Sequence, residues 1–308
     1  MTRWTAADIP DQTGRTVLIT GANSGLGLRS AQALAERGAH VLIACRDAEK
    51  GRAALAEVSR TATTAPELVE LDLADLASVR RAAEEVRTRT DGLDVLMNNA
   101  GVMATPHRRT RDGFELQIGT NHFGHAALTW LLLPALRAGA RVVTVSSLAH
   151  RGGGLDLDDL HFTRRRYTPT RAYSQSKLAN LLFMLWLDRE AQRAGRDLVS
   201  VAAHPGVAGT ELTRNTARTY ALPGPVRDAV GAVTRLFTQP AERGALPQLF
   251  AATARGVRGG DYFGPSRLGE MRGHPSRVRP SRAAQDARTA ERLWEVTIEQ
   301  TGIAPDWS

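Results

Sequence analysis

A glycine-rich turn close to the amino terminus limits the possible folds of this chain more than any other feature. The short apolar run Thr16–Thr20 leads directly into Gly21-Ala22-Asn23-Ser24-Gly25-Leu26-Gly27, and a helical pattern follows as far as Ala35. Glycines allow a backbone to approach a pyrophosphate, and the start of a helix supplies free N–H groups. The spacing is G-x-x-x-G-x-G and not the commoner G-x-G-x-x-G. Because a strand precedes the turn and a helix follows it, we interpret it as a nucleotide-binding turn and not as a plain glycine turn.

Short apolar runs and helical patterns alternate along the rest of the chain. The further predicted strands are His40–Ala44, Glu67–Leu71, Leu93–Met97, Arg141–Val145, Leu198–Ala203 and a short one at Asp261–Phe263. The predicted helices include Gly113–Leu136, the helix that carries Tyr173, Ala241–Ala254 and 281–301. This alternation predicts an α/β fold. With 308 residues, 42% of them hydrophobic, and no internal repeat, we expect one domain over residues 1–308.

The amino-terminal and apolar segments bear on the cellular location. Met1–Thr16 contains Asp8 and Asp11 and no apolar run, which is unlike a signal peptide. The longest apolar segments, Ala126–Leu136 and Leu178–Leu187, are too short to cross a bilayer. We therefore expect a cytoplasmic protein without a membrane anchor.

Cysteine and charge composition exclude other classes of protein. The single cysteine, Cys45, allows no internal disulfide, and no Cys/His cluster surrounds it, so we expect no metal site. The formal net charge is +8, but arginines are spread among acidic residues, and the densest basic region, Arg255–Arg288, is a Gly/Pro-rich tail. We predict a solvated basic surface and no nucleic-acid partner. Only Lys50 and Lys177 among the forty basic residues are lysines, which makes Lys177 a candidate for a site that needs a compact, tunable ammonium.

The residues after the second predicted strand bear on the choice of nucleotide. In NAD enzymes an acidic residue about 20 positions beyond the glycines binds the ribose 2′-hydroxyl. Here Cys45 and Arg46 occupy that place, and Arg46 can bind a 2′-phosphate with help from Lys50 one helical turn later. Asp47 could take the NAD role if the strand ended later. The pattern favours NADP over NAD.

Polar residues also follow the third and fourth predicted strands. Asp72 either contacts an adenine edge or caps the helix that begins near Asp75, and the sequence does not decide between these. The run Asn98-Asn99-Ala100-Gly101 either brings backbone against a cofactor ribose or forms an ordinary turn.

Ser146 and Ser147 follow the fifth predicted strand, on the side of a parallel sheet where ligands bind. No acid–histidine pair and no G-x-S-x-G motif accompanies them, so a serine hydrolase is not predicted. Asn121 interrupts an amphipathic helical pattern, where its amide could order water or simply lie exposed. The basic loop 104–113 is predicted to be solvated and not to bind substrate.

Tyr173 and Lys177 are four residues apart on a predicted helix, so both side chains can serve one site. A cation next to a phenol favours the phenolate, which makes the pair suitable for general acid–base work on a carbonyl. Such a pair also occurs by chance, and its interpretation depends on the motifs around it.

These motifs together resemble the short-chain dehydrogenases/reductases, and within them the retinol-dehydrogenase-like branch. The segments that carry the resemblance are ITGANSGLG (19–27), ACRDAEKG (44–51), NNAGVM (98–103), NHFGHAALT (121–129), VSSLAH (145–150), YSQSKLANLLF (173–183) and HPGVAGTEL (204–212). The resemblance covers nearly the whole chain. It implies a Rossmann-like, doubly wound parallel sheet of about seven strands in the order 3-2-1-4-5-6-7, with helices on both faces.

The resemblance also implies roles for individual residues. Tyr173 would exchange a proton with the substrate oxygen, and Lys177 would hold the nicotinamide ribose and lower the pKa of Tyr173. Ser147 would hydrogen-bond the carbonyl, and Asn121 would anchor a water that relays protons. The expected cofactor-binding residues are Thr20, Gly21, Asn23, Ser24, Gly25, Leu26, Gly27, Arg46, Lys50, Asp72, Leu73, Asn99, Ala100, Gly101, Tyr173, Lys177, Pro205, Gly206, Val207 and Thr210.

The chain is therefore expected to be an NADP(H)-dependent oxidoreductase, with NAD(H) less favoured, that interconverts an alcohol and a ketone or aldehyde on a lipophilic small molecule. Residues 14–147 would form mainly the cofactor-binding half, and the segments 148–170 and 207–239 would cover the substrate. The family resemblance suggests a homodimer or homotetramer. The alternatives are a cofactor-retaining epimerase or dehydratase and a non-catalytic nucleotide-sensing regulator.

Overall fold

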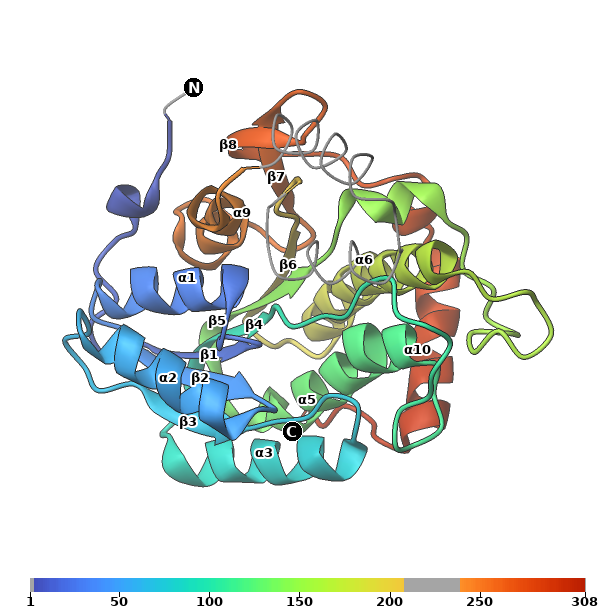
Figure 1. The fold of residues 1–308 in the computed structure, drawn as a ribbon, viewed down its shortest axis with the longest axis horizontal. Helices are drawn as coiled ribbons and strands as arrows, with labels where there is room; N and C mark the ends of the chain where they lie inside the picture. The colour runs from blue at the N-terminus through green and yellow to red at the C-terminus, as the bar shows by residue number, and fades with distance from the viewer. Residues whose placement is uncertain (1–2, 208–238, 308) are drawn as a thin grey trace, which may run out of the picture.

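A central eight-stranded sheet organises the computed structural model, which describes residues 3–207 and 239–307 (Figure 1). The strand order is β3-β2-β1-β4-β5-β6-β7-β8. The strands are β1 (Thr16–Thr20), β2 (His40–Cys45), β3 (Glu67–Glu70), β4 (Leu93–Asn98), β5 (Leu136–Val145), β6 (Leu198–Ala203), β7 (Tyr262–Arg267) and β8 (Arg272–Arg277). The first seven run parallel, which confirms the predicted fold class and strand order.

The eighth strand, β8, extends the predicted sheet. It pairs antiparallel with β7, and Pro265 lies opposite Pro275 in the ladder. Prolines cannot donate to a ladder and are confined to sheet edges and irregular positions, and β8 forms the edge here. Because Gly273 and Pro275 interrupt this segment, no alternating apolar pattern marks it as a strand in the sequence.

Helices cover both faces of the sheet (Figure 1). One apolar cluster joins the sheet to α1 (Gly25–Ala35), α2 (Ala48–Ser59) and α9 (Ala241–Thr253). The other cluster joins it to α3 (Leu76–Arg89), α5 (Gly124–Leu132), α6 (Pro169–Arg193) and α10 (Ala287–Thr301). Buried strands with apolar residues on both sides are typical of a doubly wound sheet, and all five residues of β1 are buried. None of the helices in the described part of the chain has both the length and the apolar character needed to span a membrane.

The predicted helix Gly113–Leu136 is not one regular helix. It begins at Leu116 as α4 (Leu116–Ile118), continues as a π-helical turn η2 (Gly119–Phe123), becomes α5 and ends in the short 3₁₀ turn η3 (Leu133–Ala135). Leu136 already belongs to β5, which therefore starts five residues before its predicted start. Apolar periodicity does not distinguish an α-helix from a π-helical turn, and such turns often occur at functional sites.

Acidic side chains fix where several helices begin. Asp47, Asp75 and Asp286 each accept hydrogen bonds from two backbone N–H groups in the first turn of α2, α3 and α10. Such caps satisfy N–H groups that have no partner inside the helix. The cap at Asp286 explains why α10 starts at Ala287, later than the predicted start at 281. A short 3₁₀ turn, η5 (Ala283–Gln285), precedes it.

Candidate active site

A cleft of about 580 Å³ lies where β1, β4 and β5 end at the carboxyl side of the sheet. Among the predicted site residues, it is lined by Thr20, Gly21, Asn23, Ser24, Gly25, Leu26, Gly27, Arg46, Lys50, Asp72, Leu73, Asn99, Ala100, Gly101, Ser147, Tyr173, Lys177, Pro205, Gly206 and Val207. Thr210 lies outside the described residues, as do positions 208–238 of the predicted covering segment 207–239. We call the part near Arg46 and Lys50 the Arg46 end, and the part near Ser147 and Tyr173 the Tyr173 end.

The cleft lies at the point where the strand order reverses between β1 and β4. Neighbouring connections leave the sheet in opposite directions there, which opens a crevice outside the carboxyl ends of the strands. The cleft also includes lining residues that the sequence had not singled out, which are Ala44, Leu71, Val102, Met103, Thr120, Val145, Leu148 and Ala149.

The glycine turn brings backbone close to the floor of the cleft. A Cβ added at Gly27 would lie 2.6 Å from the Asn99 amide nitrogen and would also meet the Gly21 carbonyl oxygen. Only glycine fits such an approach. Ser24 precedes α1 and, among the described residues, makes no side-chain capping bond, so the first N–H groups of α1 have no side-chain cap there. These groups can therefore bind an anion at the helix start.

Thr20 joins the end of β1 to the segment that follows β4. Its hydroxyl oxygen accepts hydrogen bonds from the backbone N–H groups of Asn99 and Ala100, both at 2.9 Å. The Asn99 amide nitrogen donates to the Thr20 carbonyl at 2.7 Å, and Gln248 donates to the other amide atom of Asn99 at 3.1 Å. Asn99 thus fixes the wall of the cleft, because both of its side-chain polar atoms are engaged within the protein.

The Arg46 end is exposed and weakly paired. The Arg46 side chain is 72% exposed and lies 4.0 Å from an Asp72 carboxylate oxygen, and Lys50 lies 3.9 Å from Asp47. Exposed ion pairs of this length contribute little to stability. Both cations can therefore turn toward an anionic ligand at small cost.

Asp72 does not cap the following helix, so the second of its two predicted roles, as a helix cap, is not found. Asp75 is the cap of α3 and accepts from the Ala77 N–H at 2.9 Å, whereas Asp72 accepts from the Ala74 N–H, two residues on, at 2.9 Å. Asp72 lines the cleft, as the adenine interpretation requires.

The helix α6 places Tyr173 and Lys177 on the same side of the cleft. The Lys177 ammonium lies 5.8 Å from the centre of the Tyr173 ring and donates to the Val145 carbonyl at 3.0 Å. The Ser146 hydroxyl donates to the Lys177 carbonyl at 2.8 Å, which ties α6 to the end of β5. Lys177 is 3% exposed, so its ammonium is held in one position before any ligand arrives.

Burial governs the titration of this pair. Burial raises the pKa of Tyr173 to about 12, and a hydrogen bond with Ser147 acts in the opposite direction. Burial likewise lowers the pKa of Lys177 to about 8. A low-dielectric site disfavours the charged form of either group. The shift comes from burial and the Ser147 hydrogen bond, so the phenol is protonated at neutral pH. A lowering of the Tyr173 pKa by Lys177 stays a prediction.

Asn121 lies next to the cleft but is not one of the residues that line it, and its predicted role of anchoring a water stays a prediction. Its amide oxygen accepts from the Val102 N–H at 2.8 Å, and its amide nitrogen donates to the Val102 carbonyl and the Ser176 hydroxyl, both at 2.9 Å. The side chain is fully buried. It links the segment after β4 to α6 near Tyr173.

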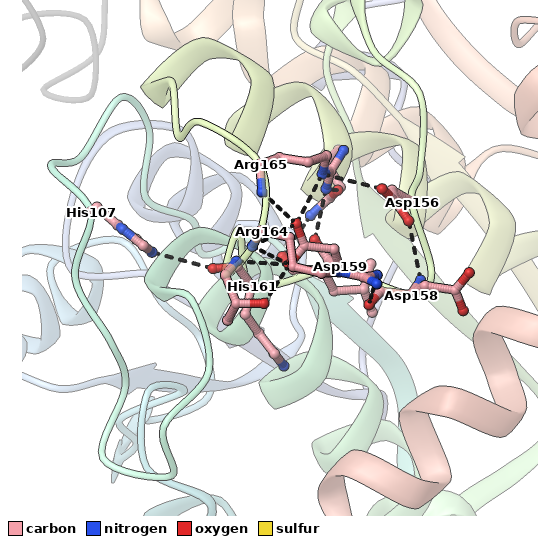
Figure 2. Close-up of polar contacts among 10 residues, drawn as sticks. His107, Asp156, Asp158, Asp159, His161, Arg164 and Arg165 are labelled. Atoms are coloured by element: carbon pink, nitrogen blue, oxygen red, sulfur yellow. Dashed lines mark hydrogen bonds and ion pairs between the residues drawn. The ribbon is translucent and has the colours of Figure 1, made fainter.

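The segment between η4 (Leu148–Gly152) and α6 is organised around one buried carboxylate (Figure 2). Asp159 is 4% exposed and accepts from the Thr163 N–H at 2.7 Å and from the Arg165 N–H at 3.0 Å. Burial by itself raises the pKa of Asp159, but these hydrogen bonds hold it well below its usual range. Arg165 also donates to Gln175 on α6 at 3.2 Å, two residues from Tyr173. The segment is thus attached to the helix that carries the site.

The basic loop 104–113 lies against the same segment. His107 stacks on Tyr167 with ring centres 4.5 Å apart, and Tyr167 donates to the Thr105 carbonyl at 2.8 Å. His107, Arg108 and Arg109 are exposed, in agreement with the predicted solvated loop.

The β7–β8 hairpin supports the wall formed by Pro205, Gly206 and Val207. The Val207 N–H donates to the Met271 carbonyl at 2.9 Å. Glu270 accepts from both Arg151 at 2.8 Å and His204 at 3.1 Å. No sequence pattern predicts this contact, because its members come from three segments that only the folded chain brings together.

Comparisons with known proteins agree with this geometry. A sequence profile described as short chain dehydrogenase matches residues 15–221. The chain belongs to the short-chain dehydrogenase family. Similar curated proteins include human retinol dehydrogenase 13, 40% identical over 94% of this chain and 85% of its own length, and human retinol dehydrogenase 12, 41% identical over 94% and 87%. The resemblance to the retinol-dehydrogenase-like branch is confirmed.

Solved structures give the same result for this short-chain dehydrogenase. An uncharacterised protein from Mycobacterium paratuberculosis is 46% identical with a TM-score of 0.82, and the match covers 99% of this chain and all of that one. The Pseudomonas aeruginosa RhlG/NADP complex is 26% identical with a TM-score of 0.63, over 81% of this chain and 94% of that one. The chain is therefore an oxidoreductase of the class that acts on CH–OH groups of small molecules with a nicotinamide dinucleotide.

Proposed function

We propose that this short-chain dehydrogenase is an NADP(H)-dependent enzyme that interconverts an alcohol and a ketone or aldehyde on a lipophilic small molecule. One observation carries the proposal: Ser147, Tyr173 and Lys177 line one end of a cleft whose other end combines a glycine turn with Arg46. A proton donor and a nucleotide-binding turn in the same cleft are what carbonyl reduction requires.

The residues of the cleft fit a dinucleotide. The Thr120 hydroxyl is buried, lines the cleft and has no hydrogen-bond partner among the described residues. A buried polar atom without a partner is costly unless a ligand or water satisfies it. A Cβ added at Gly101 would lie 3.2 Å from the Asn121 amide oxygen and 3.5 Å from the Lys177 ammonium. A glycine at this position therefore leaves space in the cleft beside the lysine.

Each side chain at the Tyr173 end would have one task. The protonated Tyr173 hydroxyl would donate its proton to the substrate oxygen during reduction and accept it during oxidation. The Ser147 hydroxyl would hydrogen-bond the same oxygen and stabilise its developing charge. The fixed Lys177 ammonium would bind the nicotinamide ribose and favour the phenolate once Tyr173 has released its proton. The nicotinamide, when bound, supplies or accepts the hydride. Asn121 would hold the backbone next to Lys177.

The Arg46 end supports a preference for NADP. Asp47 was the alternative ribose ligand, but one of its carboxylate oxygens accepts from the N–H groups of Glu49 and Lys50 as the cap of α2. β2 ends at Cys45, so Arg46 is the first residue beyond it. Arg46 and Lys50 would bind the 2′-phosphate, which an exposed guanidinium can contact with two donors.

The lining at the Tyr173 end supports a lipophilic substrate. Met103, Leu148, Ala149 and Val207 present apolar surface to the cleft there. Similar proteins carry the name retinol dehydrogenase. We extend this to a lipophilic alcohol or carbonyl compound for the present chain. A single domain over 1–308, a homo-oligomeric assembly and a cytoplasmic location remain predictions.

The test is a spectrophotometric assay in which lipophilic ketones and aldehydes, retinal among them, are added to enzyme with NADPH or NADH. We expect substrate-dependent loss of NADPH absorbance, and a slower reaction with NADH. An epimerase or dehydratase would convert its substrate without net loss of NADPH. A nucleotide sensor would bind NADPH tightly and turn over nothing in the panel, and either result would refute the proposal.

A further inference from the structure

Two buried histidines occupy the helical segment that carries Asn121. His122 is 1% exposed and His125 is 2% exposed, and both belong to the NHFGH run that begins at Asn121. Burial lowers the pKa of His122 to about 3 and that of His125 to about 4, so both rings are neutral at pH 7. A neutral imidazole has one donor and one acceptor nitrogen. Which nitrogen carries the proton follows from the partners of each ring.

The partners of His125 fix its tautomer. Its Nδ1 lies 3.0 Å from the Asn121 carbonyl oxygen, which can only accept, so Nδ1 carries the proton. Its Nε2 lies 2.8 Å from the Thr20 hydroxyl and must therefore accept.

The hydroxyl of Thr20 is free to donate to this nitrogen. Its oxygen already accepts from the N–H groups of Asn99 and Ala100, which uses both acceptor positions. The remaining hydroxyl proton can point to His125 at 2.8 Å or to the Met97 carbonyl at 3.4 Å. The shorter contact is the better hydrogen bond, so the proton points to His125.

His125 thus lies between two parts of the site, the backbone of Asn99 and Ala100 on one side and helix α6 on the other. On one side Thr20 holds the backbone of Asn99 and Ala100, which lines the cleft. On the other side Asn121 bonds to Ser176, whose hydroxyl donates to the Tyr173 carbonyl at 2.8 Å.

We propose that His125 is a positioning residue for the reaction, which as the neutral Nδ1–H tautomer holds Thr20 and the Asn121 backbone at a fixed separation. His125 does not line the cleft. It acts through Thr20 and Asn121. It thereby sets the position of the Asn99 and Ala100 backbone relative to Tyr173 and Lys177. The π-helical turn Gly119–Phe123 places Asn121 and His122 within it and His125 just beyond it.

His122 is the matched control on the same turn. Its Nε2 lies 2.9 Å from the Thr297 hydroxyl on α10, and that hydroxyl donates to the Leu293 carbonyl at 2.7 Å. The His122 Nε2 must therefore carry the proton, which is the opposite tautomer. His122 connects its helical turn to α10 and is not among the residues that line the cleft. Two histidines with similar burial thus have different partners, and only one of them contacts the site.

The first test needs no catalysis. Nuclear magnetic resonance of the protein with ring-¹⁵N-labelled histidine reports which nitrogen carries the proton, and the His125 signals are assigned by their loss in His125→Asn. We expect the Nδ1–H pattern for His125 and the Nε2–H pattern for His122. The His125 pattern should persist down to about pH 5, because burial lowers the pKa of His125 to about 4. An Nε2–H pattern for His125 would overturn the proposal.

The second test rests on the proposed function and compares His125→Leu with His122→Leu by single-turnover hydride transfer and by NADPH affinity. A misplacement of the reacting groups by about 1 Å can slow a reaction about 10²-fold, so we expect the His125→Leu rate to fall about 10-fold to 100-fold. Its NADPH dissociation constant should change by about 3-fold or less, because the phosphate-binding backbone remains. His122→Leu should lose thermal stability but keep its rate within about 2-fold.

Several outcomes distinguish the two proposals. Equal rate losses in the two leucine variants would make His125 an ordinary packing residue and overturn the inference. If His125→Leu does not fold, His125→Asn replaces it. An asparagine can keep a donor near the Asn121 carbonyl while losing the Thr20 contact. A His125→Asn rate equal to that of the unsubstituted enzyme would then overturn the proposed role of His125. If no carbonyl compound is reduced at all, the proposed function fails, and the tautomer measurement still decides the geometry around His125.

Discussion

At the Tyr173 end of the cleft, Lys177 is 3% exposed and its ammonium is fixed on the Val145 carbonyl, whereas at the Arg46 end the Arg46 side chain is 72% exposed and its nearest carboxylate is 4.0 Å away. The two ends thus hold their cations in different ways. In the proposed function the Tyr173 end would transfer a proton, which needs groups that are already aligned, and its side chains are buried and hydrogen-bonded. The Arg46 end would bind a phosphate, for which charge that can move to the ligand is suited, and its cation is exposed.

Substitutions at the two ends should therefore have different effects. At the Tyr173 end they should change the rate or the stability, because the side chains there are packed and bonded. At the Arg46 end they should change nucleotide affinity alone, since exposed and weakly paired side chains contribute little to folding.

Tyr173→Phe should have the largest effect. Removing the proton donor should lower turnover about 10³-fold, the usual contribution of general acid catalysis. The NADPH dissociation constant and the melting temperature should stay close to those of the unsubstituted enzyme, because the ring that packs beside Lys177 is kept. Steady-state assays and a binding titration check this, and undiminished turnover would remove Tyr173 from its assigned role.

Asp159→Asn should cost about 2–3 kcal/mol in the free energy of unfolding, because buried N–H groups of the segment lose an ionised acceptor. The hydrogen bonds hold the pKa of Asp159 below its ordinary value, so its contribution is complete at neutral pH and is lost as the pH falls below about 4. Urea unfolding at pH 7 and at lower pH measures both. The exposed neighbour Asp158→Asn is the control and should change little; equal losses would show that Asp159 has no special role.

Arg46→Ala should weaken NADPH binding about 10-fold, because an exposed charge-assisted contact is worth little more than 1.4 kcal/mol. NADH binding and the melting temperature should hardly change. Fluorescence titrations with both nucleotides at low and high salt check this, since salt screens an exposed charge. The control is Arg81→Ala, an exposed arginine on α3. Equal losses of NADPH and NADH affinity would refute the 2′-phosphate role.

Lys177→Met should raise the free energy of unfolding at pH 7 by about 1 kcal/mol, because a buried charge is replaced by an apolar side chain of similar length. The Val145 carbonyl keeps a partner, since Asn180 also donates to it at 3.0 Å. Burial lowers the pKa of Lys177 to about 8, so the unfolded chain binds this proton more tightly and stability should rise with pH above about 8. That rise should be missing in the methionine variant. A less stable variant would show that Lys177 also supports the fold.

Local patterns in the sequence were enough for the fold class and for most of the cleft. The glycine turn lies between a strand and a helix, and the runs that follow place Asn99, Ser147 and Tyr173 at strand ends or helix starts. In a parallel sheet these ends share one edge, so residues far apart in the sequence could be assigned to one site. The same reasoning failed for β8, where proline and glycine hide a strand that exists only because β7 is beside it.

The order of the strands, through the family resemblance, and the residue types that meet at the cleft could thus be predicted from the sequence. The partners of individual polar atoms are seen only in the folded protein: Asp75 and not Asp72 caps α3, Asn121 bonds to Val102, and His125 bridges Thr20 and Asn121. Periodicity and spacing report which face of an element is buried, whereas hydrogen-bond partners and shifted pKa values depend on groups that other elements bring into contact.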